Sequence, residues 1–257
     1  MNTKDTVAVA SRSFSQNTFL VSKLKNLYSS IILNETGKTL EGEDLINFLK
    51  PASKAIIGIE AMPDHVLSEL PDLKVISKYG VGLNNLDLEL LRSYKIKLGF
   101  TPGVNKQSVA ELALTLILIG LKKIQDNKLE ILDGNWSQEK GSELFGKTIG
   151  LLGFGNIGQR LASLIQPFNC DIIFFDKKDF SDGEIKNISN DINLNPNSIC
   201  QLPLDLVLSK SDIVSIHLPL SKQTANLISA SNFNKLKSSV CIAVSYTHLT
   251  LPTNREV

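Results

Sequence analysis

The sequence predicts an α/β protein with two parallel sheets, each covered by helices on both faces. Short β-branched runs alternate with amphipathic helical stretches in two successive series, and strands that alternate with helices form parallel sheets. The breaker Thr101-Pro102-Gly103 separates the two series, and a glycine-rich turn follows the first strand of the second. We therefore expect two domains, residues 1–101 and residues 102–243.

The first series begins near the N-terminus. Strands are expected at Thr6–Ser11, Ile31–Leu33, Ala55–Ile59, Val75–Ser77 and Ile96–Gly99. Helices are expected around Asn17–Tyr28, Gly42–Leu49 and Leu86–Tyr94, with a further helix from Pro63. Proline explains two of these limits: Pro51 cannot continue a helix, whereas Pro63 suits a first helical turn.

A long apolar helix, expected over Lys106–Lys123, leads from the first series to the second. A polar stretch containing Gly134, Trp136 and Gly141 follows it. The second βα series then begins at Lys147. This order predicts that the helix is the crossover between the two domains.

The glycine-rich turn is Gly153-Phe154-Gly155-Asn156-Ile157-Gly158, placed between a buried-strand run and a helix. This strand–turn–helix setting is what the G-x-G-x-x-G pattern of dinucleotide-binding, Rossmann-type domains requires. Gly153 permits the tight turn, Gly155 lets a pyrophosphate approach the backbone, and Gly158 lets the helix pack against the strand. The helix start, with Asn156 and Ile157, presents free N–H groups to phosphates. An ordinary glycine turn is the alternative.

An acidic residue follows the next expected strand. The apolar run Asp171–Phe175 ends at Asp176, 18 positions past Gly158, where a ribose-binding carboxylate belongs. A carboxylate accepts hydrogen bonds from a ribose 2′-hydroxyl and repels a 2′-phosphate, so the cofactor is expected to be NAD rather than NADP. Lys177 and Lys178 follow directly and could soften this preference.

Composition excludes several other classes of protein. Hydrophobic residues make up 42% and charged residues 21%, which is typical of a soluble globular protein. The net charge of +1 gives no reason to expect nucleic acid or a membrane as partner. No signal peptide or membrane span is visible, and the three cysteines have no metal-ligand spacing, so a cytoplasmic protein without a bound metal is expected.

Over residues 5–243 the chain resembles the D-2-hydroxyacid dehydrogenases, in particular their phosphoglycerate-dehydrogenase-like members. The matching motifs are Lys78–Asp87, Thr101–Asn105 with Ser108–Ala113, Glu143–Thr148, and Ser211–Leu220 with Thr224. The resemblance implies a flavodoxin-like substrate domain followed by a Rossmann-type, doubly wound parallel-sheet domain. It also implies hydride transfer between NAD and C2 of a 2-hydroxy or 2-keto acid, and a homodimer for the full-length protein.

The resemblance also assigns roles to individual residues. It places Lys78, Val81, Gly82 and Asn105 at the substrate, with the N–H groups of Val81 and Gly82 receiving its carboxylate. Beside the cofactor it places His217, Leu218, Pro219 and Thr224. The alternatives are a plain strand-to-helix turn for the glycine loop and a strand-end histidine with a satisfied ring for His217.

The family's catalytic Arg, Glu and His are expected after the strand at Val240–Ala243, and the chain does not contain them. We therefore expect an incomplete second domain and no turnover from this chain. Val244–Thr253 matches the in-frame translation of a transposase adapter used in DNA library preparation. Residues 244–257 are accordingly expected to be an artefact, and His248 is not expected to be catalytic.

The sequence says less about the substrate. Glu60, after the third strand, would repel a phosphate, although Arg12 or Lys78 could compensate, so 3-phosphoglycerate is a possible substrate. A non-catalytic, corepressor-like NAD-binding regulator on the same fold is the alternative function. A different Rossmann enzyme, such as a methyltransferase, conflicts with the motifs of the first domain.

Overall fold

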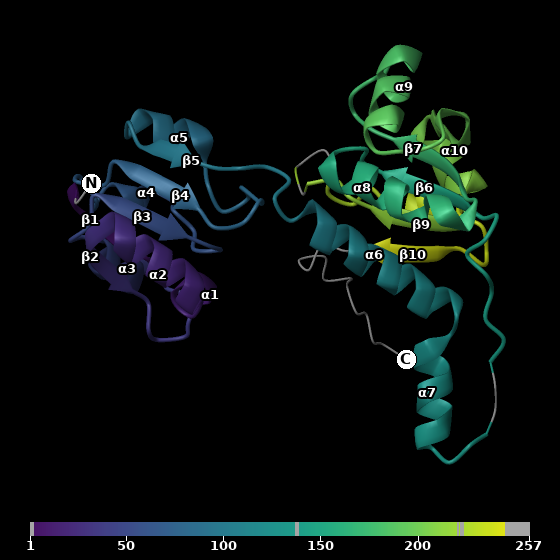
Figure 1. Cartoon of the computed structure of the whole chain (residues 1–257), viewed down its shortest axis with the longest axis horizontal. Helices are drawn as coiled ribbons and strands as arrows, with labels where there is room; N and C mark the ends of the chain where they lie inside the picture. The colour runs from purple at the N-terminus through teal and green to yellow at the C-terminus, as the bar shows by residue number, and fades with distance from the viewer. Residues whose placement is uncertain (1–2, 137–138, 220, 222–223, 245–257) are drawn as a thin grey trace. The chain divides into compact units, whose positions relative to one another are not determined.

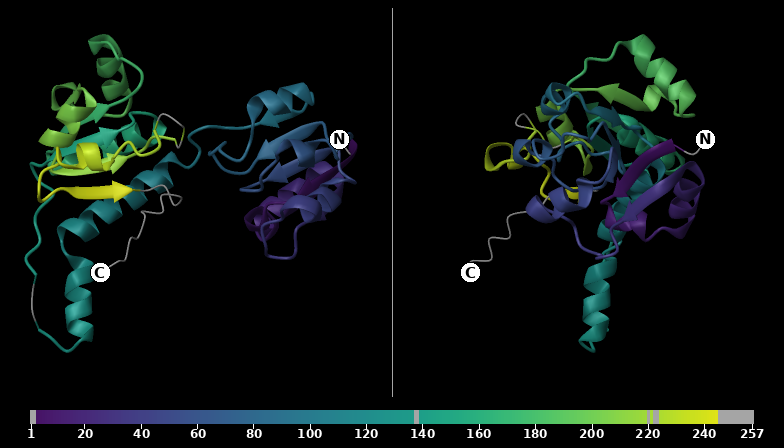
Figure 2. Two further views of the ribbon diagram at one scale, coloured as in Figure 1. Left: turned by 180° about the vertical axis from the view of Figure 1, so that it is seen from behind. Right: turned by 90° about the vertical axis from the view of Figure 1, so that its left-hand side faces the viewer.

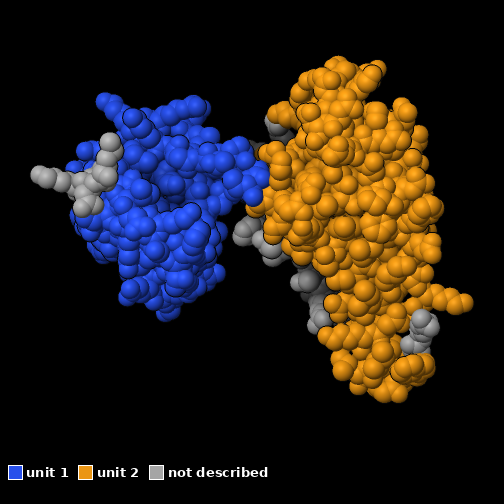
Figure 3. Space-filling model, viewed as in Figure 1, with its two compact units in different colours: residues 1–104 blue, residues 105–257 orange. Residues whose placement is uncertain are grey.

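The computed structural model describes residues 3–136, 139–219, 221 and 224–244 of the chain. It divides into two compact units, residues 1–104 and residues 105–257 (Figures 1 and 3). Apart from Val244, the expected adapter-derived segment lies outside the described residues, and so does His248.

Unit 1 is a parallel five-stranded sheet in the order β2-β1-β3-β4-β5. Its strands are β1 (Thr3–Val9), β2 (Tyr28–Leu33), β3 (Lys54–Ile57), β4 (Val75–Lys78) and β5 (Lys97–Gly99). The helices between them are α1 (Arg12–Ser15), α2 (Thr18–Leu27), α3 (Gly42–Leu49), α4 (Asp64–Leu67) and α5 (Leu88–Ser93). Every strand pairing recorded in this sheet is parallel, as the alternation of strands and helices predicts.

Helix starts in unit 1 follow from local side-chain caps. The Asn17 side chain accepts a hydrogen bond from the N–H of Leu20 at the start of α2, and the Asp87 side chain accepts bonds from Glu89 and Leu90 at the start of α5. These bonds satisfy backbone donors that a first helical turn leaves free. Pro63 is the residue immediately before α4.

Unit 2 is a second parallel five-stranded sheet, in the order β10-β9-β6-β7-β8. Its strands are β6 (Thr148–Leu152), β7 (Asp171–Phe175), β8 (Ile199–Gln201), β9 (Ile213–Ile216) and β10 (Cys241–Val244). The α-helices are α6 (Lys106–Leu121), α7 (Ile124–Leu132), α8 (Asn156–Ile165), α9 (Asp182–Asp191), α10 (Leu204–Lys210) and α11 (Ala230–Phe233). Short 3₁₀ turns cover Gln166–Phe168 and Pro196–Ser198.

Apolar side chains cover both faces of this second sheet. Ile149 of β6 belongs to a buried cluster with Ile117 of α6 and Leu161 of α8. Leu152 of the same strand belongs to a separate cluster with Val207 of α10. Alternate residues of a strand point to opposite faces, so β6 is buried from both sides. The α/β fold class predicted from the sequence is confirmed.

The long crossover helix is shorter than predicted. It ends at Leu121, and α7 begins three residues later, within a stretch that the sequence indicated to be a polar connection. Lys123 lies between the two helices with φ 54° and ψ 32°, in the left-handed region, and this conformation breaks the helix. Figures 1 and 2 show α7 running away from the sheet of unit 2.

No helix in the described part of the chain is long and apolar enough to cross a membrane. Cys170, Cys200 and Cys241 are free thiols. The described residues contain no group of three or more His, Cys, Asp or Glu side chains arranged to hold a metal ion.

Candidate dinucleotide-binding site

The glycine-rich turn joins β6 to α8. Gly153, directly after β6, has φ +101°, which a residue with a side chain rarely adopts. A Cβ at this position would lie 2.9 Å from the carbonyl oxygen of His217 and 3.1 Å from the Leu218 side chain. Glycine is therefore required here both by the backbone conformation and by the close approach of the segment after β9.

The other two glycines of the motif differ sharply in their surroundings. A Cβ on Gly158 would collide with the carbonyl oxygen of Gly153, so this glycine allows α8 to start against the turn. A Cβ on Gly155 would meet no atom within 4 Å. The space beside Gly155 is open, so a ligand can approach the backbone there.

The N-terminus of α8 faces this open space without a side-chain cap. Gly155 is the N-cap residue, and within the described part of the chain no side chain accepts a hydrogen bond from the first turn of the helix. Gly155 and Asn156 are exposed, and Ile157 is half-buried. The first N–H groups of an α-helix have no partner within the helix and carry a partial positive charge, so this end of α8 suits an anion.

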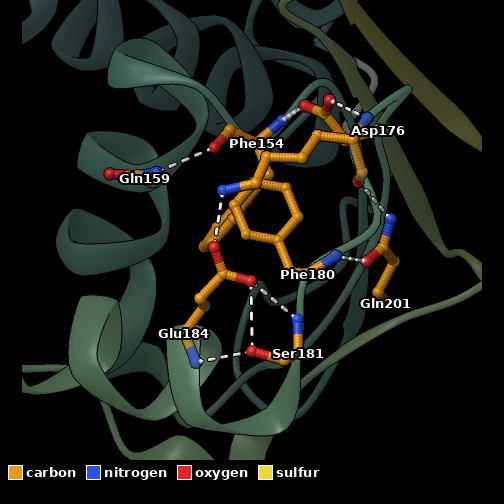
Figure 4. Close-up of polar contacts among 8 residues, drawn as sticks. Phe154, Gln159, Asp176, Phe180, Ser181, Glu184 and Gln201 are labelled. Atoms are coloured by element: carbon orange, nitrogen blue, oxygen red, sulfur yellow. Dashed lines mark hydrogen bonds and ion pairs between the residues drawn. The ribbon is translucent and has the colours of Figure 1, made fainter.

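The Asp176 carboxylate is tied to the turn. Its Oδ2 accepts a 2.7 Å hydrogen bond from the backbone N–H of Phe154, and its Oδ1 accepts a 3.0 Å bond from the N–H of Lys178 (Figure 4). Asp176 directly follows β7, which pairs with β6. The structure thus brings the expected ribose-binding acid and the glycine-rich turn together.

Three phenylalanine rings, one of them from the turn itself, pack against one another beside the glycine-rich turn. Phe154 is 1% exposed, and its ring stacks on that of Phe174 with the centroids 4.2 Å apart. The Phe180 ring meets both edge-on, with centroid distances of 6.0 Å to Phe154 and 5.6 Å to Phe174. Since buried aromatic contacts of this kind restrict motion, they hold the residue between the first two glycines in place.

The segment after Asp176 is fixed by polar contacts, which Figure 4 shows. The Gln201 side chain accepts a 2.8 Å bond from the N–H of Phe180 and donates a 2.8 Å bond to the carbonyl of Lys178. The Lys178 ammonium lies 2.7 Å from Glu184 and 4.5 Å from the centre of the Phe180 ring.

His217 lies beside the turn, immediately after β9. Its backbone N–H donates a 2.8 Å bond to the carbonyl of Leu152, and its Nε2 is 2.9 Å from the hydroxyl oxygen of Ser215. Burial lowers the pKa of His217 to about 4, because removal from water disfavours the charged ring. The ring is therefore neutral near pH 7.

Leu218, Pro219 and Thr224 are the other residues expected beside the cofactor. Leu218 is half-buried against the cluster around Leu152, whereas Pro219 is exposed. The Thr224 hydroxyl donates a 2.5 Å bond to the carbonyl of Pro219 and accepts a 2.8 Å bond from the N–H of Ser221. Thr224 thus holds the backbone of Pro219 and of Ser221.

The expected substrate loop in unit 1 follows β4. Gly80 has φ +125°, and Val81 and Gly82 are half-buried loop residues. Among the described residues, none accepts a hydrogen bond from the N–H of Val81 or Gly82. Two donors in succession are therefore available to an anion.

The Lys78 side chain makes its hydrogen bonds within the framework of unit 1. Its ammonium donates to the carbonyl of Gly58 and, over 3.0 Å, to Oδ1 of Asn85. Burial lowers the pKa of Lys78, and the charge of nearby Glu60 opposes that shift. Lys78 here braces the start of the loop, a position that the motif alone did not predict.

Glu60, which is expected from the sequence to repel a phosphate, is 1% exposed, and its carboxylate accepts a 2.5 Å bond from the N–H of Gly58. A buried carboxylate with a backbone donor serves the local turn.

Asn105 is the N-cap residue of α6 but makes no capping bond from its side chain. Its Oδ1 is buried and has no hydrogen-bond partner among the described residues. A buried oxygen without a partner is costly, and such groups are concentrated where a ligand supplies the missing bond.

An open hollow of about 890 Å³ lies next to Asp176. It is bounded by the end of β7, the start of α9 and the segment around β8; among its lining residues are Asp176, Phe180, Lys186, Cys200, Gln201 and Leu202.

Sequence reasoning missed several residues that shape the site. Glu184 and Gln201 were not singled out, and neither were the Phe174 and Phe180 rings. For Glu184 a signal was present, since Ser181-x-x-Glu184 has the spacing of a helix capping box. The others depend on contacts between segments far apart in the sequence, which no spacing rule predicts.

Comparison with known proteins identifies the family. The model of the D-isomer specific 2-hydroxyacid dehydrogenase NAD-binding domain matches residues 114–244. The chain is 31% identical over 214 residues to hydroxypyruvate reductase of Thermotoga maritima, covering 82% of this chain and 65% of that protein. It is 37% identical over 180 residues to glyoxylate reductase of Thermofilum pendens, covering 68% of this chain and 50% of that protein. It therefore spans less than two thirds of the length of these curated relatives.

A solved structure supports the fold. D-lactate dehydrogenase of Aquifex aeolicus, determined in complex with NAD and lactic acid, is similar with a TM-score of 0.76 and 23% identity, covering 93% of this chain and 68% of that one. The family predicted from the motifs is thus confirmed: this chain belongs to the D-isomer specific 2-hydroxyacid dehydrogenases.

Proposed function

We propose that this chain provides the cofactor site and part of the substrate site of an NAD-dependent oxidoreductase that acts on a small 2-hydroxy or 2-keto acid. The observation that carries the proposal is the convergence of the open turn at Gly155, the uncapped start of α8 and the Asp176 carboxylate. Bound NAD would supply the acceptor or donor of a hydride.

The chain's own groups fit the cofactor. The open space at Gly155 and the free N–H groups at Asn156 and Ile157 suit a pyrophosphate, and Asp176 suits a ribose hydroxyl. Asp176 already accepts two backbone bonds, but a carboxylate has about four lone-pair sites and can accept more. A neutral His217, with Leu218, Pro219 and Thr224, would line the cofactor side of the site without adding charge.

For the substrate, we assign the N–H groups of Val81 and Gly82 to its carboxylate. Asn105 is assigned a polar contact because its buried Oδ1 has no partner among the residues that the structure describes. Lys78 is assigned the bracing of the loop, since Gly58 and Asn85 occupy its ammonium. Two of the three N–H donors of the Lys78 ammonium are used in this way, which favours an unphosphorylated acid over 3-phosphoglycerate.

The corepressor-like alternative is not favoured, because the relatives of the chain are reductases and dehydrogenases. Turnover of glyoxylate, hydroxypyruvate, D-lactate and 3-phosphoglycerate with NAD(H) by the whole protein separates the two functions. Activity with an unphosphorylated acid supports the enzyme, and cofactor binding without turnover of any 2-hydroxy or 2-keto acid supports the regulator.

Cofactor binding by this chain tests the site directly. In the variant Gly155→Leu the Cβ meets no atom within 4 Å, so its unfolding midpoint should stay near that of the wild type. Its dissociation constant for NADH, from fluorescence titration, should rise roughly tenfold or more because the side chain occupies the approach to the turn. Gly183→Leu is the matched control, because Gly183 also has open space around it. Equal NADH affinity in both variants would reject the assignment.

We also propose that a second copy of this chain covers α7. None of its residues is buried, and Ile124, Leu129, Ile131 and Leu132 are between 49% and 70% exposed. A cluster of exposed apolar side chains of this kind typically marks a protein interface, and two-fold homodimers are the commonest assembly. Light scattering should give a dimer mass for the wild type and a monomer mass for Leu129→Glu. Leu206→Glu, at an exposed leucine of α10, should remain a dimer.

A further inference from the structure

Lys178 lies where a cation for a 2′-phosphate would be expected. It is two residues after Asp176, and its backbone N–H donates to Oδ1 of that carboxylate. In dinucleotide sites of this type, a basic side chain near the ribose-binding position accommodates the additional phosphate of NADP. From the sequence alone, Lys178 could therefore soften the preference for NAD that Asp176 predicts.

The Lys178 ammonium is already engaged elsewhere. It lies 2.7 Å from Oε1 of Glu184 and 4.5 Å from the centre of the Phe180 ring. The Lys178 and Glu184 side chains are 58% and 45% exposed, so the pair contributes little to the stability of the fold. Its effect is to set the direction of the lysine side chain.

Glu184 is held in position by the start of α9. Its Oε2 accepts bonds from the N–H of Ser181, at 2.9 Å, and from the Ser181 hydroxyl, at 3.1 Å. These contacts form a capping box, which leaves Oε1 for Lys178 (Figure 4). Hydrogen bonds from Lys178 and Ser181 lower the pKa of Glu184 to about 2, so the carboxylate stays ionised at neutral pH.

The Phe180 ring, which the Lys178 ammonium contacts, is held in place as well. Phe180 packs edge-on against Phe154, the residue between the first two glycines of the turn, and its N–H donates to Gln201. The direction of Lys178 is therefore set by two groups that are each anchored independently.

We propose that Glu184 determines cofactor specificity by holding the Lys178 ammonium, so that this lysine does not neutralise the extra charge of a 2′-phosphorylated dinucleotide. This inference rests on the proposed function and deepens it. Asp176 repels the 2′-phosphate, and Glu184 prevents the neighbouring lysine from offsetting that repulsion. Glu184 is a positioning residue, since it acts through Lys178.

The test is a double-mutant cycle on the whole chain. Glu184→Gln removes the charge but retains an oxygen that can accept from Ser181. The dissociation constants of NADH and NADPH are measured by fluorescence titration. The ratio of the NADPH constant to the NADH constant should fall roughly 3- to 10-fold, the scale of one partly exposed charge-assisted contact. In a Lys178→Met background the same substitution should leave the ratio unchanged.

Asp182→Asn is the matched control, because it removes a carboxylate from the first turn of the same helix, and Asp182 has no ion pair among the described residues. It should leave the ratio near the wild-type value. An unchanged ratio in Glu184→Gln overturns the specificity proposal. An equal shift of the ratio in the Lys178→Met background or in Asp182→Asn overturns it as well. In each of these cases, NADH binding by the wild-type chain still supports the proposed function. If the wild-type chain binds neither dinucleotide, the proposed function is wrong and the specificity proposal with it.

Discussion

The backbone N–H of Phe154 donates a 2.7 Å hydrogen bond to Oδ2 of Asp176, which links the turn after β6 to the residue after β7. Because β6 and β7 are neighbours in one parallel sheet, both segments leave the sheet at the same edge. The acid therefore supports the shape of the glycine-rich turn in addition to the role that we propose for it at the ribose.

These two contributions of Asp176 can be separated. Asp176→Asn keeps an oxygen that can accept from Phe154, whereas Asp176→Ala leaves this partly buried donor without its partner. Urea unfolding should therefore show a loss of about 1–3 kcal/mol for the Ala variant relative to the Asn variant. NADH affinity should fall in both. Equal stability of the two variants would show that the hydrogen bond contributes nothing to the turn.

Gly158→Ala should be destabilising, because its Cβ collides with the carbonyl oxygen of Gly153 and neither backbone segment can give way easily. We expect a loss of about 1–3 kcal/mol in urea unfolding. Gly183→Ala is the control: it lies in α9 with open space around it, and should stabilise the chain by about 0.5–1 kcal/mol. Opposite signs for the two substitutions are the expected result, and a neutral Gly158→Ala would contradict the packing seen here.

His217 makes stability depend on pH. The folded pKa of about 4 lies below the ordinary value of 6.5, so between these pH values the unfolded chain binds a proton that the folded chain does not. The free energy of unfolding therefore decreases as pH falls from 6.5 to 4, by up to about 3 kcal/mol, and levels off below. Urea unfolding of the wild type and His217→Gln at pH 7.5 and pH 4.5 isolates this contribution from the other titrating groups. A pH dependence identical in both proteins would refute it.

Lys123→Gly should stabilise the break between α6 and α7. Lys123 has φ +54°, a conformation that costs a residue with a side chain about 1–2 kcal/mol and costs glycine almost nothing. The salt bridge lost with Asp126 spans 3.5 Å on the surface and is weak. Lys122→Gly is the control: at φ −85° it should be neutral or destabilising. A rise in Tm for both variants would point to charge rather than backbone conformation.

Much of the fold was predictable because its signals are local. Gly42–Leu49 was predicted with the bounds that the structure gives to α3, and the strand before the glycine-rich turn was located correctly. Here apolar spacing and proline and glycine breakers determine the element. The start of α7 could not be predicted in this way, because it depends on one lysine in a left-handed conformation.

The candidate site was predictable in its positions but not in its contacts. The sequence indicated Asp176 from its distance to the turn, and the structure brings the two together. The Lys78 ammonium binds Gly58 and Asn85, and the Lys178 ammonium binds Glu184. Only the folded chain brings these partners close to the lysines. A long, flexible cation has several acceptors within reach, and the sequence does not say which of them it meets.

All the strands of the sheet in unit 1 come from residues 3–99, and this has a consequence for biosynthesis. A ribosome adds roughly 5–20 residues per second, and domains fold as units from the N-terminal end. The first sheet can therefore close while the glycine-rich turn is still being translated. Its edge strands β2 and β5 can then pair with other nascent chains from that moment on, so a chaperone that binds during synthesis would act on this sheet first.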